Sequence, residues 1–189
     1  MGVVLTMTMV MITAVAMTRE RERGTMENLL ATPALPVEVM IGKVLPYIIV
    51  GYIQLILIYI VAHLLFKVPT EGSLLLLLFT SLPFIAANLS VGLMFSTAAK
   101  NQLQAIQMST FFFLPSILLS GFLFPFRGMP DWAQWIGTVL PLTHFLKIVR
   151  GILLKGNGVF EIWPELWPIL LFMVGALIIG IKRYRQTLD

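Results

Sequence analysis

The sequence predicts an all-α membrane protein with about five transmembrane helices, and its composition carries that prediction. Of the 189 residues, 58% are hydrophobic and only 12% are charged, and the mean hydropathy is +0.92. An ordinary soluble domain is about 45–50% apolar and about 25% charged. Long apolar runs approach the roughly 20 residues that a helix needs to cross a bilayer, and most charged residues lie between these runs.

Five apolar runs are the expected spans. They are residues 1–17, 44–62, 74–96, 104–124 and 166–181, and together they predict one transmembrane domain over residues 1–189. The first run is short and has no basic residue before it, so we expect a span cut at its N-terminal side rather than a signal peptide. Pro83 and Pro115 fall inside spans and are expected to kink them, because proline removes a helix hydrogen bond.

The basic residues near the span ends predict the orientation, because cytoplasmic loops of membrane proteins are enriched in Lys and Arg. If residues 18–36 are cytoplasmic, the larger share of the basic residues falls inside, namely Arg19, Arg21, Arg23, Lys43, Lys100, Lys182, Arg183 and Arg185. A cytoplasmic C-terminus follows from this arrangement.

Residues 18–36 hold charges that the neighbouring apolar runs lack. Charge alternates in sign from Arg19 to Arg23, which predicts that the first helix continues into solvent. Gly24 interrupts this run, and Thr25 is a suitable cap for a second, short helix. That helix has an apolar stripe of Met26, Leu29 and Leu30. The stripe suits either lipid headgroups or a groove on another protein, and the residues leave both open.

The connection at residues 130–155 has helical periodicity but no piece long enough to span a membrane. Apolar residues recur at helical spacing on both sides of Pro141, which suits the first turn of a helix. The second piece reaches only about 22 Å even if fully helical. We expect a helical pair that enters the outer leaflet or lies along it, with Lys147, Arg150 and Lys155 toward water or headgroups. One interfacial anchoring helix is the alternative.

Small residues at helical spacing predict close helix packing. Asn88, Gly92 and Ser96 share one helical face, and Ala176 and Gly180 repeat the spacing near the C-terminus.

Several chemistries find no support in the residues. The chain has no cysteine, only two histidines far apart in sequence and no GxxxxGK[ST] phosphate loop, so we expect no metal site and no bound cofactor. No charged residue lies deep within an expected span, which argues against a proton- or ion-coupled carrier. A membrane hydrolase would need a base, and His144 is expected instead to be a hydrogen-bonded interfacial histidine.

Two stretches carry a family resemblance: TRERERGTMENLLATPALPVEVMIGKVLPYI, and LLSGFLFPFRGMPDWAQWIGTVLPLTHFLKIVRGILLKG. Together they resemble the permease subunit of type 2 ABC exporters, particularly the bacterial multidrug type, over essentially the whole chain. The similarity is to the C-terminal half of such a permease, beginning inside its second span, without the first span and the large extracytoplasmic region.

The resemblance implies a function for both unusual segments. The first would form the connecting and coupling helices that press on the ATPase, through Glu20, Arg21, Glu22, Arg23, Gly24, Thr25, Met26, Glu27, Leu29 and Leu30. The second would form external re-entrant helices that help close the pathway, and it includes Pro130, Trp132, Pro141, His144, Lys147 and Arg150.

The implied activity is ATP-driven export of an amphipathic or drug-like substrate across a bacterial inner membrane. The chain itself would not be an enzyme, since ATP and magnesium would bind a separate ABC ATPase subunit. The other expected partners are a second permease subunit, in a homo- or heterodimer, and membrane lipid, with no nucleic acid. The alternative is a secondary transporter or a membrane scaffold without an ATPase partner.

Overall fold

The computed structural model describes residues 1–23 and 36–186, and these ranges contain helices and no strands. The helices are α1 (Gly2–Glu22), α3 (Pro36–Phe66), α4 (Leu74–Ala98), α5 (Gln102–Leu119), the short 3₁₀ helix η1 (Phe126–Gly128), α6 (Asp131–Val139), α7 (Pro141–Lys155) and α8 (Val159–Gln186). Of these, α1, α3, α4, α5 and α8 are long and apolar enough to cross a membrane. The all-α membrane fold with five spans is therefore confirmed, whereas the short helix expected after Gly24 lies outside the described residues.

Helices α5 and α8 do not coincide with the expected spans. Helix α5 ends at Leu119 rather than Phe124, because the chain turns at Gly121, which has a φ of +80°. Helix α8 begins at Val159, ahead of the expected residue 166, and continues through Pro164 and Pro168. An apolar run reports hydrophobicity and not backbone conformation, so neither the turn nor the proline-containing first turns of α8 could be read from it.

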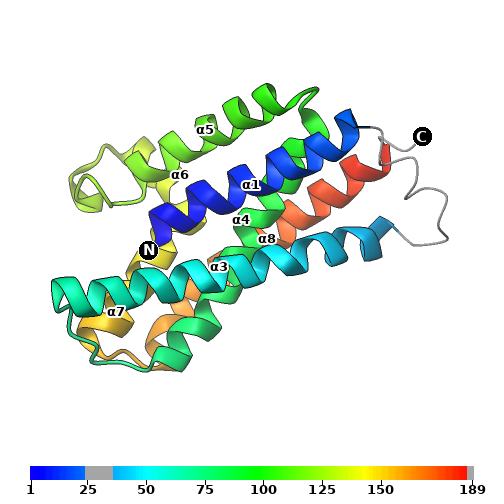
Figure 1. Ribbon diagram of the computed structural model, residues 1–189. Helices are drawn as coiled ribbons and strands as arrows, with labels where there is room; N and C mark the ends of the chain where they lie inside the picture. Colours follow the sequence, from blue (N-terminus) through cyan, green and yellow to red (C-terminus); the bar gives the residue numbers. More distant parts are fainter. Residues whose placement is uncertain (24–35, 187–189) are drawn as a thin grey trace.

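Helix α4 is the centre of the bundle, with α1 and α8 packed against it (Figure 1). Helix α1 lies close to α4 at Gly92 of α4. A Cβ atom built on Gly92 would lie 2.7 Å from the carbonyl oxygen of Val10 and 2.8 Å from Cβ of Thr13. Asn88 and Ser96, on the same face of α4, are both buried. The face of small residues thus lies where two backbones come together.

The second set of small residues lies on α8. Ala176 is buried in a cluster with Val10 and Val91, and a Cβ atom on Gly180 would be 4.0 Å from the carbonyl oxygen of Ser90. Ala176 therefore packs where α8 meets α1 and α4, and Gly180 faces α4.

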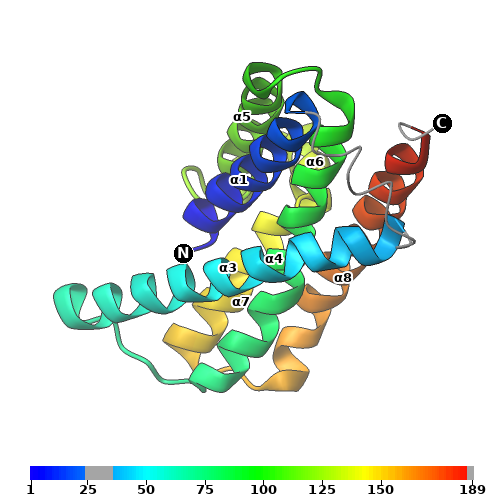
Figure 2. The ribbon, with the colours of Figure 1, turned by 45° about the vertical axis from the view of Figure 1, so that its right-hand side comes forward.

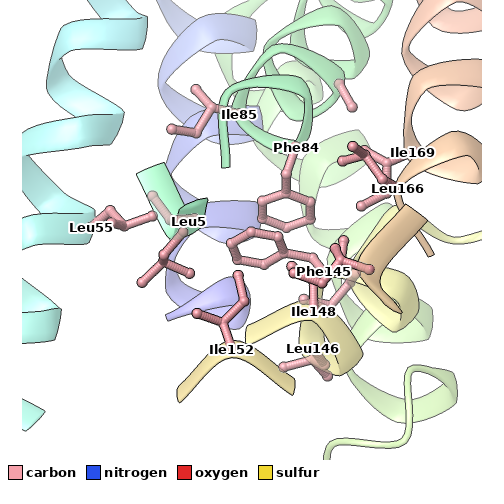
Figure 3. Packing of buried hydrophobic residues seen from close by; sticks show 14 of the residues in the cluster. Leu5, Leu55, Phe84, Ile85, Phe145, Leu146, Ile148, Ile152, Leu166 and Ile169 are labelled. Atoms are coloured by element: carbon pink, nitrogen blue, oxygen red, sulfur yellow. The ribbon is translucent and has the colours of Figure 1, made fainter. Parts of the chain in front are cut away.

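Helices α6 and α7 form a bent pair, with an angle of 80° between them at Leu140. Helix α7 is inserted into the bundle, and its Phe145 stacks on Phe84 of α4 with ring centroids 3.9 Å apart and planes 2° apart (Figure 3). Helix α6 instead exposes Trp132 and Trp135. The connection is therefore the expected helical pair and not a single anchoring helix, but its second member is a buried part of the core.

Helices α3 and α5 flank this core and keep large apolar faces exposed. Figure 2 shows α3 crossing α4. The crossing is held where Tyr52 Oη donates to the carbonyl oxygen of Leu78 at 3.0 Å and where Gly51 approaches Ile85. Such exposed faces are typical of surfaces that contact lipid or another membrane subunit.

The close contact at Gly92 predicts that a larger side chain at this position destabilises the protein. Gly92→Leu should lower the free energy of unfolding by about 1–3 kcal/mol, because the side chain would force α1 away from α4. The matched control is Gly175→Leu on α8, since no atom lies within 4 Å of a Cβ built there. Thermal unfolding in detergent should separate the two variants, and equal melting temperatures would contradict the packing.

Candidate functional site

The last turn of α1 is bonded to the end of α4 through Arg21. Its Nη2 atom donates to the carbonyl oxygen of Ser96 at 2.8 Å, and Nη1 donates to that of Ala99 at 3.3 Å. The final carbonyl groups of a helix lack partners within the helix and carry the negative end of its dipole. A guanidinium group there satisfies both requirements, so Arg21 caps α4 from a neighbouring helix.

Glu22 bonds in the opposite sense to the start of α5. Its Oε1 atom accepts from the backbone N–H of Gln102 at 3.0 Å, and its Oε2 atom accepts from the side-chain amide of the same residue. The first N–H groups of a helix are unpaired and carry the positive dipole end, which favours a carboxylate. Asn101 caps the same helix, with Oδ1 accepting from Gln104 N at 2.8 Å.

These contacts join three helices at one end of the bundle, and we call them the α1 clamp: Arg21 and Glu22 with Ser96, Ala99 and Gln102. Two adjacent, oppositely charged residues hold the end of one helix and the beginning of the next. Any displacement of the last turn of α1 must therefore either move the α4–α5 connection or break charged hydrogen bonds. The clamp therefore links movement of α1 to movement of the α4–α5 connection.

The structure places the predicted coupling residues unevenly. Glu20, Arg21, Glu22 and Arg23 lie at the end of α1, where Arg21 and Glu22 form the clamp. Gly24, Thr25, Met26, Glu27, Leu29 and Leu30 lie outside the described residues. The clamp residues Ala99 and Gln102 were not anticipated, although Asn101 followed by Gln104 is a recognisable start of a helix.

A second polar arrangement lies at the bend between α6 and α7. His144, only 8% exposed, has Nδ1 2.6 Å from Glu165 Oε2 and Nε2 2.8 Å from the carbonyl oxygen of Thr138. Lys147 Nζ lies 3.0 Å from Glu165 Oε1. We call this the His144 cluster: His144, Lys147 and Glu165 with the Thr138 carbonyl. It joins α6, α7 and α8.

Both ring nitrogens of His144 face oxygen atoms: Nδ1 faces the carboxylate of Glu165, and Nε2 faces the carbonyl oxygen of Thr138. Lys147 forms an ion pair with the same carboxylate, so Glu165 has two nitrogen partners from α7. A partly buried carboxylate is stabilised by partners of this kind. The cluster therefore connects α6, α7 and α8 through polar contacts.

The remaining predicted residues of this segment take distinct places. The carbonyl of Pro130 accepts from Ala133 N at 2.9 Å at the start of α6, Pro141 is the first residue of α7, and Arg150 is exposed on α7. Glu165 was not anticipated as the partner of His144. The available signal was an acidic residue between apolar residues in WPELW, at the same end of the bundle as the basic residues of α7. Within the described ranges, no group of three His, Asp or Glu residues could hold a metal ion.

The helices and these two arrangements define a multi-pass integral membrane protein with a charged arrangement near each end of its bundle. Residues 1–154 match the ABC-2 type transporter family, and the chain belongs to that family.

Three curated relatives from Escherichia coli K12 show where the similarity lies. The chain is 34% identical over 150 residues to the probable multidrug ABC transporter permease YbhR, covering 79% of this chain and 41% of the relative. It is 38% identical over 137 residues to the similarly named YbhS, covering 72% and 36%. It is 31% identical over 172 residues to the inner membrane transport permease YhhJ, covering 89% and 45%. The matched region is thus less than half the length of each of these relatives.

The α1 clamp predicts a local effect on dynamics. Arg21→Gln should increase hydrogen exchange at residues 99–104 by about tenfold, because hydrogen bonds to charged groups contribute about 1.5 kcal/mol or more. The control is Arg19→Gln, which removes the same charge from an exposed position on the same turn. Hydrogen exchange is measured by mass spectrometry, and equal exchange at residues 99–104 in the two variants would contradict the clamp.

The His144 cluster predicts a global effect. Glu165→Gln keeps the side-chain shape but removes the charge opposite His144 and Lys147, so we expect a loss of about 1–3 kcal/mol in the free energy of unfolding. Glu71→Gln is the control, because Glu71 is an exposed glutamate at the C-terminal end of α7, away from the cluster. Denaturation in detergent should show the loss for Glu165→Gln alone, and an unchanged midpoint would refute the assigned contacts.

Proposed function

We propose that this chain forms the membrane pathway of an ATP-driven ABC exporter, with a separate ABC ATPase bound at the end of α1. The α1 clamp is the observation that carries the proposal, because it links the segment at which an ATPase would bind to two membrane helices. Membership of the ABC-2 family supports the class of transporter, and the names of YbhR and YbhS support an amphipathic or drug-like substrate.

The energy source in this proposal is external to the chain. The sequence has no phosphate loop, so ATP and magnesium would bind the ATPase subunit. In the described helices, the charged residues of the candidate spans lie near the span ends: Arg19 to Glu22 on α1, and Glu161 and Glu165 on α8. A carrier driven by protons or ions usually has such groups near the midplane.

The proposed path of coupling follows contacts that the structure contains. An ATPase acting on residues 18–36 would displace the last turn of α1, which Arg21 and Glu22 join to α4 and α5. Helix α4 carries Phe84, whose ring stacks on Phe145 of α7. ATP can shift the equilibrium between two states of the permease only through contacts that differ between them, and the clamp is one set that a moving α1 would change.

The remaining parts of the proposal concern assembly and orientation. The clamp end would face the cytoplasm of a bacterium together with the C-terminus, consistent with the basic residues near it. The α6–α7 bend would then lie at the opposite surface and help to close the pathway. A second permease subunit would pair with this one, and the exposed apolar faces of α3 and α5 offer surface for that subunit or for lipid.

The double variant Glu27→Arg with Leu29→Asp tests the docking step. Introduced into this chain in the assembled transporter, it should abolish co-purification with the ATPase and ATP-dependent export, because it reverses one charge and places another in the apolar stripe. Co-purification in mild detergent and export from vesicles are the two measurements.

The matched control is Glu71→Arg with Phe66→Asp, which makes the same chemical changes at exposed positions near the opposite end of the bundle. This variant should retain ATPase binding. If both doubles bind the ATPase and export as well as the parent, the proposed docking segment is wrong.

A further inference from the structure

A cavity of about 440 Å³ lies between α7 and α8, separate from the α1 clamp. Its polar lining comes from Lys147, Arg150 and Lys155 of α7, Asn157 of the connection, and Glu161 and Glu165 of α8. Ile148, Leu154 and Ile162 add apolar surface. The cavity therefore combines charged groups with apolar walls.

The charges in this cavity are unequally neutralised. Glu165 is paired with Lys147 and His144, and Glu161 Oε2 accepts from the backbone N–H of Gly158 at 2.8 Å. In the part of the chain that the structure describes, neither the Arg150 side chain nor the Lys155 side chain has an ion pair or hydrogen bond. The two free cations lie five residues apart on one helix and line one cavity.

The amide of Asn157 is placed beside these cations by the local backbone. Gly156 ends α7 with a φ of +65°, and Asn157 N donates to the carbonyl oxygen of Gly151 at 3.0 Å. A Cβ atom on Gly151 would lie only 2.8 Å from Asn157 Nδ2, so the glycine leaves room for the amide against α7. The cavity thus has a neutral hydrogen-bond donor beside its two unpaired cations.

The surroundings of the cavity indicate the ligand. Phe160, Trp163 and Trp167 are 94%, 55% and 51% exposed on the first turns of α8, which also contributes Glu161, Ile162 and Glu165 to the lining. Exposed tryptophans at the end of a membrane span are typical of the headgroup level of a bilayer. A lipid bound there would have its charged group in the cavity, at the headgroup level that these tryptophans mark, and its apolar chains beside exposed apolar side chains of the wall such as Leu154.

We propose that this cavity binds the phosphodiester of a membrane phospholipid. The Arg150 guanidinium presents a planar fork that suits two phosphate oxygens, Lys155 supplies a second positive charge, and Asn157 donates from its amide. Glu161 opposes an anionic headgroup, so it reduces affinity for that class of lipid. The proposal does not depend on export or on an ATPase.

The test is lipid binding by this chain in mild detergent, measured by native mass spectrometry with phosphatidylglycerol as the probe. Arg150→Gln with Lys155→Gln should weaken binding by about fivefold for each cation removed. The control, Lys67→Gln with Lys182→Gln, removes two exposed charges elsewhere and should leave binding unchanged. Equal binding by both doubles, or equal loss in both, would overturn the site.

Two further measurements distinguish loss of the site from misfolding, and a phospholipid site from a general anion site. Glu161→Gln should strengthen phosphatidylglycerol binding, a gain that a damaged fold would not produce, and unchanged or weaker binding would count against the proposal. Inorganic phosphate should compete only weakly, because it lacks acyl chains to contact the exposed apolar wall of the cavity at Leu154. Displacement by phosphate as effective as that by the lipid would show a general anion site and refute the phospholipid assignment.

Discussion

The stack of Phe84 on Phe145 is the contact on which the rest of this structure depends. Both side chains are fully buried, and their rings join α4, the central helix, to α7, which is too short to cross a membrane. Lipid provides little hydrophobic force between helices, so close packing must hold α7 in place. Once α7 is held, the bend at Leu140 directs α6 outward, and His144 reaches Glu165 on α8.

Helix α4 connects the two ends of the bundle. At its C-terminal end Arg21 bonds to its last carbonyl groups, one to two turns earlier Gly92 brings α1 into backbone contact, and near its middle Phe84 supports α7. The contacts of the α1 clamp and of the His144 cluster lie where they complete a helix terminus or pair a charge. Their positions follow from the cost of leaving such groups unpaired near lipid.

Composition and run length predicted the number of spans because bilayer thickness sets helix length. The same runs did not give the end of α5, because hydrophobicity does not encode the left-handed turn at Gly121. They also did not give the start of α8, which begins at Val159 and contains Pro164 and Pro168. Charge alternation identified Arg21 and Glu22, but their partners Ser96 and Gln102 are 75 and 80 residues away in sequence. No local pattern reports such a pairing, and the same holds for His144 and Glu165.

The most direct test of the coupling account is a distance measured across the bend during ATP binding. Spin labels on Trp135→Cys and Phe160→Cys would report α6 against α8 at exposed positions, and this chain has no other cysteine. With the ATPase bound, ATP should change the distance distribution, and Glu27→Arg with Leu29→Asp should abolish the change. A distance distribution that does not change when ATP binds would contradict the account, and so would a change that persists in the double variant.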